Sequence, residues 1–418
     1  MIIRIRKFLF CVLFFYLSTS VALSQQNLPS DNFYLVESVP VETILEQSKL
    51  PRTPDVWLDM LNNAKSTLDI EMFYIANQKD EVLEQVLTAI KNAALRGVQV
   101  RIIIDEGFYK SSEKSADELN DLKNITIRKI PFKEIAGGVM HAKYFVVDDF
   151  DLFVGSQNMD WRALKHIHEM GVRVKNEKIA KTFLNIFNID WNLCESQGKT
   201  DIISLRKKYN RNIINSRTPV KINTEEFGNV RIYTAFSPPD MTPKKCNKEE
   251  KELIKIINKA KERLYIQMYS YSLRGKEKGT TYEVIDRALR KAAKRGVQIK
   301  IIFSNWAIRS GATESIKELS TVQNIEIKFS NIPEYSGGFI PYARVEHCKY
   351  FISDNNVSWI STANWEWGYF HDTRNATMII KNGKVNSELE EVFLRDWNGN
   401  LTEKVDVNKE YKPVKRTK

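Results

Sequence analysis

Short apolar runs alternate with helix-spaced patterns in two separate stretches of the chain. In the first stretch, residues 68–75 form an apolar and aromatic run that predicts a strand, and residues 82–96 carry apolar side chains at helical spacing. Gly97 stands where a C-terminal helix glycine is expected, and the apolar run 98–105 is typical of a strand buried on both faces. The second stretch repeats this order, with a helix at 282–295 between two strands.

These stretches belong to an internal repeat of about 200 residues, which is too long for a solenoid and fits a duplicated domain. The matched segments include Arg96–Val100 with Arg295–Ile299, and Asp190–Asn192 with Asp396–Asn398. Strand–helix–strand order implies right-handed crossovers. We therefore expect an α/β protein of two duplicated α/β/α halves, each with a mixed, mostly parallel sheet, packed to form one active site at their interface.

A polar motif, His-x-Lys-x-x-x-x-Asp, recurs within the repeat. It runs from His141 through Lys143 to Asp148, and from His347 through Lys349 to Asp354. An Asn follows each histidine by seventeen residues, at Asn158 and Asn364. Two copies in register, with the same downstream Asn, are very improbable by chance. They indicate two half-sites of one centre.

The spacing separates reactive from structural positions if the motif lies on a strand. Side chains two residues apart share a face, so His141 and Lys143 face one pocket together. Asp148 lies an odd number of positions beyond Lys143. We therefore expect Asp148 and Asp354 to be structural or orienting groups rather than chemical participants.

The residue types favour phosphodiester chemistry. One imidazole can attack phosphorus, and the other, protonated, can donate a proton to the leaving oxygen and later deprotonate water. Two lysines and two asparagines would stabilise the negative charge of a five-coordinate transition state. Lys is normally protonated and does not bind metals, so the sequence predicts no metal and no other cofactor, with activity best below neutral pH.

These motifs resemble those of the phospholipase D superfamily, and the resemblance covers about residues 34–400. It is closest to the endolysosomal phospholipase D3/D4 group and its poxviral relatives. Gly155–Arg162 and Ser361–Phe370 are the similar segments. The resemblance implies the phospholipase D fold and a phospho-histidine intermediate, with 5′-to-3′ exonuclease action on single-stranded DNA or RNA. It implies a catalytic set with His141 as nucleophile, His347 as general acid and base, and Lys143, Lys349, Asn158 and Asn364.

The chain departs from the family pattern in small ways. Ser361 replaces a glycine. In some relatives a carboxylate shortly after the Asn holds the nucleophilic histidine, and Glu169 is the candidate to hold His141. The equivalent position in the second half is Asn375, with Asp372 nearby. This difference is consistent with unequal roles for the two histidines.

Aromatic residues follow both asparagines and have two interpretations. They could stack on bases, as in single-strand binders, or pack in the core. We take Trp365 and Tyr369 as the substrate-binding candidates; the others are Trp161, Trp367 and Phe370. The three remaining histidines, His166, His168 and His371, are expected to be solvated or to support the site from outside.

The N-terminus predicts entry into the secretory pathway. Basic residues precede an apolar run that is short for a membrane span, and residues 1–24 read as a signal peptide; an uncleaved type II anchor is the alternative. The mature protein would be secreted or lie in the endolysosomal lumen. Glycosylation is then expected at the sequons of Asn124, Asn356, Asn375 and Asn400, with at least one unused because Asn356 and Asn375 flank the second motif.

The remaining divisions are residues 25–200 for the first half, 201–226 for a linker, 227–402 for the second half and 403–418 for a basic flexible tail. Outside the signal there are three cysteines, which allow at most one bridge, and Cys194–Cys246 is the pair considered. Cys348 alternates with the motif residues and should pack in the core.

A formal net charge of +11 suits a polyanionic substrate. The leading hypothesis is single-stranded nucleic acid. The alternatives are an anionic phospholipid, hydrolysed or exchanged by phospholipase D activity, and a catalytically dead binding protein. No protein partner is predicted, and a homodimer is left open.

Overall fold

The computed structural model describes residues 28, 30–195 and 202–417. The predicted signal or anchor, residues 1–24, lies outside this part of the chain. Among the described residues, no helix has the length and apolar character needed to cross a membrane.

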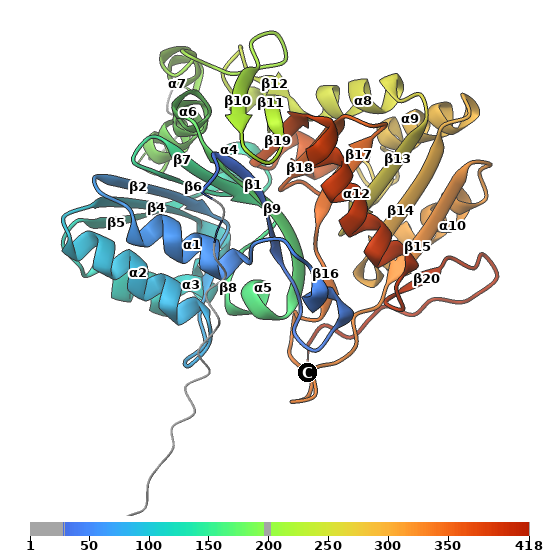
Figure 1. Ribbon diagram of the computed structural model, residues 1–418, viewed down its shortest axis with the longest axis horizontal. Coiled ribbons are helices and arrows are strands. Elements are labelled where there is room, and N and C mark those ends of the chain that lie inside the picture. The colour runs from blue at the N-terminus through green and yellow to red at the C-terminus, as the bar shows by residue number, and fades with distance from the viewer. Residues whose placement is uncertain (1–27, 29, 196–201, 418) are drawn as a thin grey trace, which may run out of the picture.

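Each half of the chain forms its own sheet, and the two sheets lie side by side (Figure 1). In the first half, three helices cover one face of the sheet and α6 covers the other. Its strands, in sheet order, are β1 (Phe33–Ser38), β9 (Ile167–Lys175), β7 (Asp151–Gly155), β6 (Lys143–Val147), β2 (Thr67–Met72), β4 (Gln99–Asp105) and β5 (Ile125–Ile130). The helices are α1 (Thr53–Asn62), α2 (Leu83–Leu95), α3 (Tyr109–Asn120) and α6 (Glu177–Leu193).

The second half repeats this arrangement with an extra strand at each edge. In sheet order its strands are β10 (Val220–Thr224), β11 (Gly228–Ser237), β19 (Asn375–Lys381), β18 (Val357–Ser361), β17 (Lys349–Ser353), β13 (Arg263–Met268), β14 (Gln298–Ser304), β15 (Ile325–Ser330) and β20 (Thr402–Lys404). The main helices are α8 (Glu249–Lys259), α9 (Val284–Lys294), α10 (Ala312–Ser320) and α12 (Gly383–Asn398).

Short elements complete the chain: β3 (Ile75–Ala76), β8 (Met159–Asp160), β12 (Asn247–Lys248), β16 (Val345–Glu346), α4 (Phe132–Ala136), α5 (Trp161–Lys165), α7 (Ile202–Lys208) and α11 (Trp367–His371). Four 3-10 turns, η1 (Ile44–Gln47), η2 (Glu106–Phe108), η3 (Pro239–Met241) and η4 (Asn305–Ala307), lie between them. The predicted α/β fold with duplicated halves is confirmed.

The expectation of mostly parallel sheets is wrong in detail. Only β2–β4–β5 and β13–β14–β15 are parallel within the main path of each sheet. The motif strands form hairpins instead, β6 with β7 and β17 with β18, and these pairs are antiparallel. Connections of a few residues can only join antiparallel strands, because a parallel pair needs a long crossover.

Local sequence signals explain the main boundaries. Gly97 and Gly296 follow α2 and α9 with φ of 101° and 95°, a conformation that glycine adopts without a steric penalty. The side chain of Asn176 caps α6 by accepting from the N–H groups of Lys178 and Ile179. Asn382 caps α12 in the same way.

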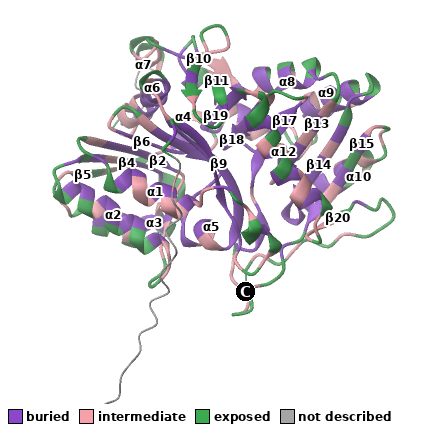
Figure 2. Ribbon diagram, in the orientation of Figure 1, coloured by how far each residue is buried: buried purple, intermediate pink, exposed green. Residues whose placement is uncertain are grey.

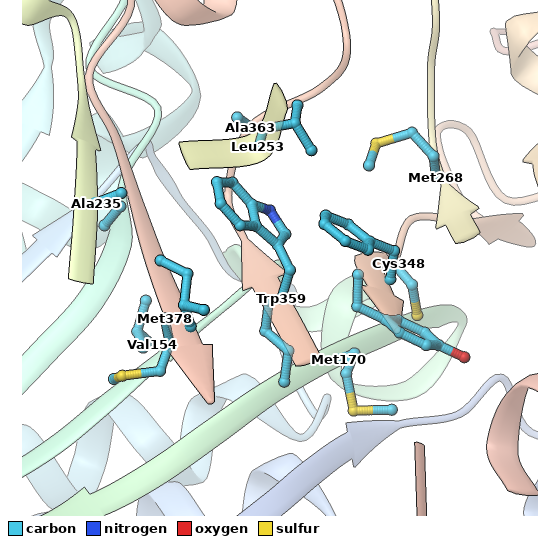
Figure 3. Close-up of a cluster of buried hydrophobic side chains, with 14 of the residues drawn as sticks. Val154, Met170, Ala235, Leu253, Met268, Cys348, Trp359, Ala363 and Met378 are labelled. Atoms are coloured by element: carbon cyan, nitrogen blue, oxygen red, sulfur yellow. The ribbon is translucent and has the colours of Figure 1, made fainter. Parts of the chain in front are cut away.

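The two halves share one apolar core. Val154 and Met170 from the first half meet Trp359, Met378 and their neighbours from the second, as Figure 3 shows. Cys348 lies in this core, as the sequence predicted. Figure 2 shows that β9, a strand of the first sheet that also pairs with β16 of the second half, is buried along almost its whole length. Burial of this kind makes a rigid boundary for a site between the halves.

The expected linker and tail are more ordered than predicted. Residues 201–226 include α7 and β10, and β10 pairs with β11. The C-terminal tail is docked: β20 pairs with β15, Tyr411 packs on Phe329, and Arg416 lies 4.8 Å above the ring of Trp306. Arginine and lysine side chains cover apolar surface in this way although their charge suggests solvent exposure. Cys194 and Cys246 are free thiols.

Candidate active site

The two motif histidines meet at the boundary between the halves. Each stands two residues before its strand, and each is fixed by the opposite half. The N–H of His141 donates to Arg374 O, with an N···O distance of 3.0 Å, and that of His347 donates to His168 O at 2.9 Å. A complete centre therefore requires both halves.

Each lysine is folded back on its own histidine. Lys143 Nζ donates to His141 O and Lys349 Nζ donates to His347 O, both at 2.7 Å. Both side chains are buried. Burial lowers the pKa of Lys143 well below its usual value and that of Lys349 to about 8. Burial and both lysines also hold the pKa of each histidine well below its usual value, so all four groups share one electrostatic environment.

An amide fixes the protonation of His141. His141 Nδ1 lies 3.1 Å from Asn375 Oδ1. The Asn375 Nδ2 group donates to Tyr369 O at 2.7 Å, so Oδ1 is the acceptor and His141 Nδ1 carries the proton. The other ring nitrogen, Nε2, is then the one with a free lone pair. Among the described residues no carboxylate contacts this ring, and burial keeps its pKa low, so His141 is a neutral imidazole.

A carboxylate lies against the other histidine. Glu169 Oε2 is 2.8 Å from His347 Nδ1, so the expectation that Glu169 holds His141 is wrong. The physical reason is that β16, which precedes His347, pairs with β9, which carries Glu169. Each histidine is thus supported from the opposite half, and the supporting groups differ.

The Glu169–His347 pair can carry one proton. Burial raises the pKa of Glu169 well above its usual value and lowers that of His347. The hydrogen bond between these two groups places that proton between Glu169 Oε2 and His347 Nδ1. His347 can therefore donate a proton from Nε2 while Glu169 stabilises the imidazolium.

Asn158 and Asn364 are buried beside the histidines. Within the described residues, Oδ1 of each has no hydrogen-bond partner. Buried polar atoms are normally paired, so these amides have hydrogen-bonding capacity for a ligand. Asp148 and Asp354 lie elsewhere: each accepts from three consecutive backbone N–H groups, at 65–67 and at 261–263. They tie the hairpin turns to β2 and β13.

Most of the aromatic residues near the histidines are not the ones that the sequence predicted as substrate-binding residues. Trp365 is 1% exposed and packs against Phe351, so its expected substrate contact is wrong; it is a core residue. Tyr369 does reach the site, with its ring 5.0 Å from that of His141.

The sequence reasoning missed two rings at equivalent repeat positions. Phe73 lies 5.0 Å from the His141 ring, and Tyr269 lies 4.7 Å from the His347 ring. Phe108, 39% exposed, packs against Phe73 with the ring centroids 4.2 Å apart and the ring planes tilted by 49°. Their common position, directly after β2 and β13, was a signal that could have found Phe73 and Tyr269.

The sequons differ in accessibility. Asn356 and Asn400 are exposed. Asn375 is fully buried and holds His141, so the prediction of a glycan there is wrong. Asn124 is half-buried, and its amide donates to Ala94 O.

Among the described residues, His168, Glu346 and Cys348 lie close together and are all buried, and their side chains are of types that can bind a metal. Both ring nitrogens of His168 already face carboxylates. The expectation of a solvated or outer role holds for the half-exposed His371. His166 is buried against Trp161 and Tyr335.

Comparison with known proteins agrees with this geometry. The family described as "Cardiolipin synthase, PLD-like domain" matches residues 57–191 and 253–397, one match in each half. The rat 5′-3′ exonuclease PLD3 is 30% identical over 409 residues, covering 90% of this chain and 80% of its own. The human protein of that name is 29% identical over 404 residues, with coverage of 90% and 81%. Phospholipase D Z of Dictyostelium discoideum is 28% identical over 392 residues, covering 90% and 91%.

Solved structures support the fold. Phosphatidylserine synthase of Haemophilus influenzae superposes with a TM-score of 0.58 at 12% identity, covering 84% of this chain and 85% of its own. At that level of identity the likeness concerns the fold alone.

Proposed function

This chain belongs to the phospholipase D family of phosphodiester hydrolases, and on that premise we propose that it is a 5′-to-3′ exonuclease acting on single-stranded DNA or RNA. The observation that carries the proposal is the unequal support of two histidines at one centre. His141 faces an amide and His347 faces a carboxylate. That asymmetry supports His141 as nucleophile and His347 as general acid and base.

The reaction has two steps. His141 Nε2 attacks phosphorus, a P–N bond forms, the P–O bond to the leaving nucleotide breaks, and His347 donates its proton to the leaving oxygen. Water then enters and loses a proton to His347; it attacks phosphorus and breaks the P–N bond. Lys143 and Lys349 offset the charge on the phosphoryl oxygens, and Asn158 and Asn364 supply amide contacts.

The aromatic surroundings favour nucleotides as substrates. Phe73, Phe108 and Tyr269 place aromatic rings near the two histidines, and base–aromatic stacking is tolerant of sequence. Relatives over most of this chain are named 5′-3′ exonucleases. Among the large exposed apolar side chains of the described residues, Phe108 borders the site through Phe73, whereas Ile44, Leu95 and Phe150 come from separate elements, so these side chains do not make one continuous rim around the site. A lipid enzyme would need such a rim.

We further propose that the protein acts in the secretory pathway or the endolysosomal lumen, without a metal and best at acidic pH. The depressed pKa of His141 keeps its imidazole neutral below pH 6.5. Lys349, with a pKa of about 8, loses its charge as the pH rises above that value. Both pKa shifts therefore favour activity at a pH below 7.

The test uses purified protein in EDTA with a 3′-labelled single-stranded oligonucleotide at pH 5 and pH 7. We expect stepwise shortening from the 5′ end, faster at pH 5, and a loss of roughly 10³-fold or more in His141→Asn and His347→Asn. Intact oligonucleotide with head-group release from anionic vesicles would replace the exonuclease with the phospholipase alternative. Loss of cleavage on chelation would refute the metal-free part.

A second substrate separates the two histidine roles. A nucleotide p-nitrophenyl ester has a leaving group that departs without protonation. His347→Asn should still release one equivalent of p-nitrophenolate and accumulate phospho-histidine at His141, whereas His141→Asn should release none. The opposite pattern would exchange the two assignments.

A further inference from the structure

A third histidine, His168, lies close to the two motif histidines and is completely buried. His168, on β9, directly precedes Glu169 and faces away from it along the strand. Its Nδ1 lies 2.6 Å from Glu346 Oε2, and its Nε2 lies 2.7 Å from Glu37 Oε1. A third carboxylate, Asp396, has Oδ2 at 3.6 Å from Nδ1.

This geometry defines the charge of the ring. A neutral imidazole has one N–H, so it can donate to only one of two carboxylates. Two contacts of this length to ionised carboxylates require both nitrogens to carry protons. Burial alone would lower the pKa of His168, but Cys348, Glu346 and Asp396 outweigh it and raise that pKa well above its usual value.

The surrounding elements supply groups of both signs. β1 contributes Glu37, β16 contributes Glu346, and α12 contributes Asp396 and Arg395. Arg395 donates to Glu37 at 2.8 Å, and Arg52 lies 3.7 Å from the same carboxyl group. From β13, the neutral Gln267 amide donates to Glu346 and Asp396, both at 2.8 Å. The thiol of Cys348 and the hydroxyl of Tyr350 complete the titratable groups near the ring. Three acids are thus balanced by two arginines and the imidazolium.

The repeat provides an independent indication. Arg374 precedes Asn375 as His168 precedes Glu169, so the two occupy equivalent positions. Arg374 is fully buried and forms two contacts with Asp190, the repeat counterpart of Asp396, at 2.6 and 2.7 Å. A permanent cation therefore stands at this position in one half, and a histidine stands at it in the other.

We propose that His168 is a positioning residue held as a buried imidazolium, which fixes the His347–Glu169 pair and ties the halves together most strongly at acidic pH. Its backbone carbonyl accepts from His347 N–H, and its ring holds Glu346, the residue before His347. The inference rests on the two-histidine centre of the proposed function, but not on nucleic acid as its substrate.

The direction of the pH effect follows from linkage. The pKa of His168 is raised on folding, so its contribution to stability is complete below the unfolded value of about 6.5. As the pH rises, the unfolded chain releases the proton first. The contribution therefore declines above that value and is lost as the pH passes the folded pKa.

The first experiment follows the imidazolium directly. The chain has five histidines, so protein labelled with ¹³C-histidine gives few ring signals, and His168→Gln assigns one of them. We expect this signal to keep the imidazolium shift from pH 5 to pH 8 in the wild type. A shift of the neutral ring at pH 8 would overturn the proposal.

Thermal unfolding compares the wild type with His168→Lys, whose reference pKa of about 10.4 keeps this position charged in the unfolded chain throughout the pH range. The Tm difference, wild type minus variant, should fall by roughly 3 °C between pH 6.5 and 8.5. The matched control is His166→Gln. Burial lowers the pKa of His166 to about 4. The Tm difference between the wild type and His166→Gln should therefore stay constant above pH 7 and change only when the pH is lowered. A flat His168→Lys difference would count against the proposal, as would a Tm increase with added Zn²⁺ that His168→Gln abolishes, because the ring would then be a ligand.

Turnover of bis(p-nitrophenyl) phosphate tests positioning without a nucleobase. His168→Gln should lower kcat by at least about 10-fold with little change in KM, and His168→Lys should restore most of it. Equal kcat in the wild type and His168→Gln would refute the positioning role. Cleavage of this diester without cleavage of oligonucleotide would remove only the proposed exonuclease function.

Discussion

One amide distinguishes the surroundings of the two motif histidines, His141 and His347. Asn375 accepts from His141 and also from the Thr362 hydroxyl at 2.9 Å, while Glu169 accepts from His347. An amide orients a ring without adding charge, whereas a carboxylate favours the imidazolium. The two rings therefore differ in proton affinity although their lysines are arranged alike.

Asn375→Asp should abolish this difference. An added carboxylate raises the pKa of His141 and favours a protonated ring, which cannot attack phosphorus. We expect kcat at pH 5 to fall by about 10-fold or more and the acidic limb of the pH–kcat profile to move up by about 1–2 units. Initial rates between pH 4 and pH 8 provide the measurement.

The control for that profile is Asn356→Asp, which also removes a sequon but lies in an exposed turn. It should leave the profile unchanged. An unmoved acidic limb in Asn375→Asp would mean that His141 is not the group whose protonation limits the rate.

The sequence predicted which motif side chains meet at the site, but not the groups that hold them in place. The doubled motif identified both histidines and both lysines, because their types and spacing carry the chemistry. The resemblance to relatives assigned Glu169 to His141, and this was wrong because position along the chain does not show which half a side chain reaches. The same limit hid the burial of Asn375 within an apparent sequon.

Among the elements, the motif strands and the tail departed from expectation. Helix and strand order followed from periodicity, but the pairing of β6 and β17 with strands across hairpins is a tertiary feature. The basic charge of the tail predicts a flexible segment. Its side chains instead take part in ring contacts: Lys317 and Lys409 approach Tyr411, and Arg416 covers Trp306.

Deleting residues 410–418 should therefore affect both stability and substrate binding. Trp306 contacts Tyr269 with rings 6.3 Å apart, and Tyr269 contacts His347. Without Arg416, whose Nη2 donates to Trp306 O, this row of rings loses its outer support. We expect a Tm lower by about 2–4 °C and a several-fold higher KM for oligonucleotide, with a smaller change in kcat.

Removal of Thr417 and Lys418 alone is the matched comparison, since it takes away one basic side chain but leaves Tyr411 and Arg416 in place. It should resemble the wild type in both measurements. If the longer deletion matched it, the tail would have no part in the site.

At the scale of the whole molecule, two buried polar clusters join the halves. Arg374 in the loop before β19 binds Asp190 in α6, and His168 in β9 binds Glu346 and neighbours Asp396 in α12. The sequence indicated the repeated Asp-Trp-Asn segments without showing that each aspartate lies against the opposite half. Such contacts depend on the packing of the domains, which periodicity does not encode.

The Arg374–Asp190 pair should contribute to stability in a way that a double-mutant cycle can resolve. Arg374→Met leaves Asp190 buried without its partner, so we expect the free energy of unfolding to fall by about 3–5 kcal/mol. Asp190→Asn together with Arg374→Met removes the uncompensated charge and should recover a substantial part of that loss. Urea unfolding of the wild type, both single variants and the double variant gives the coupling free energy between Arg374 and Asp190.

Because one apolar core spans both halves, all four proteins should unfold in a single transition. Two separate transitions in Arg374→Met alone would show that this pair, rather than the shared core, couples the halves.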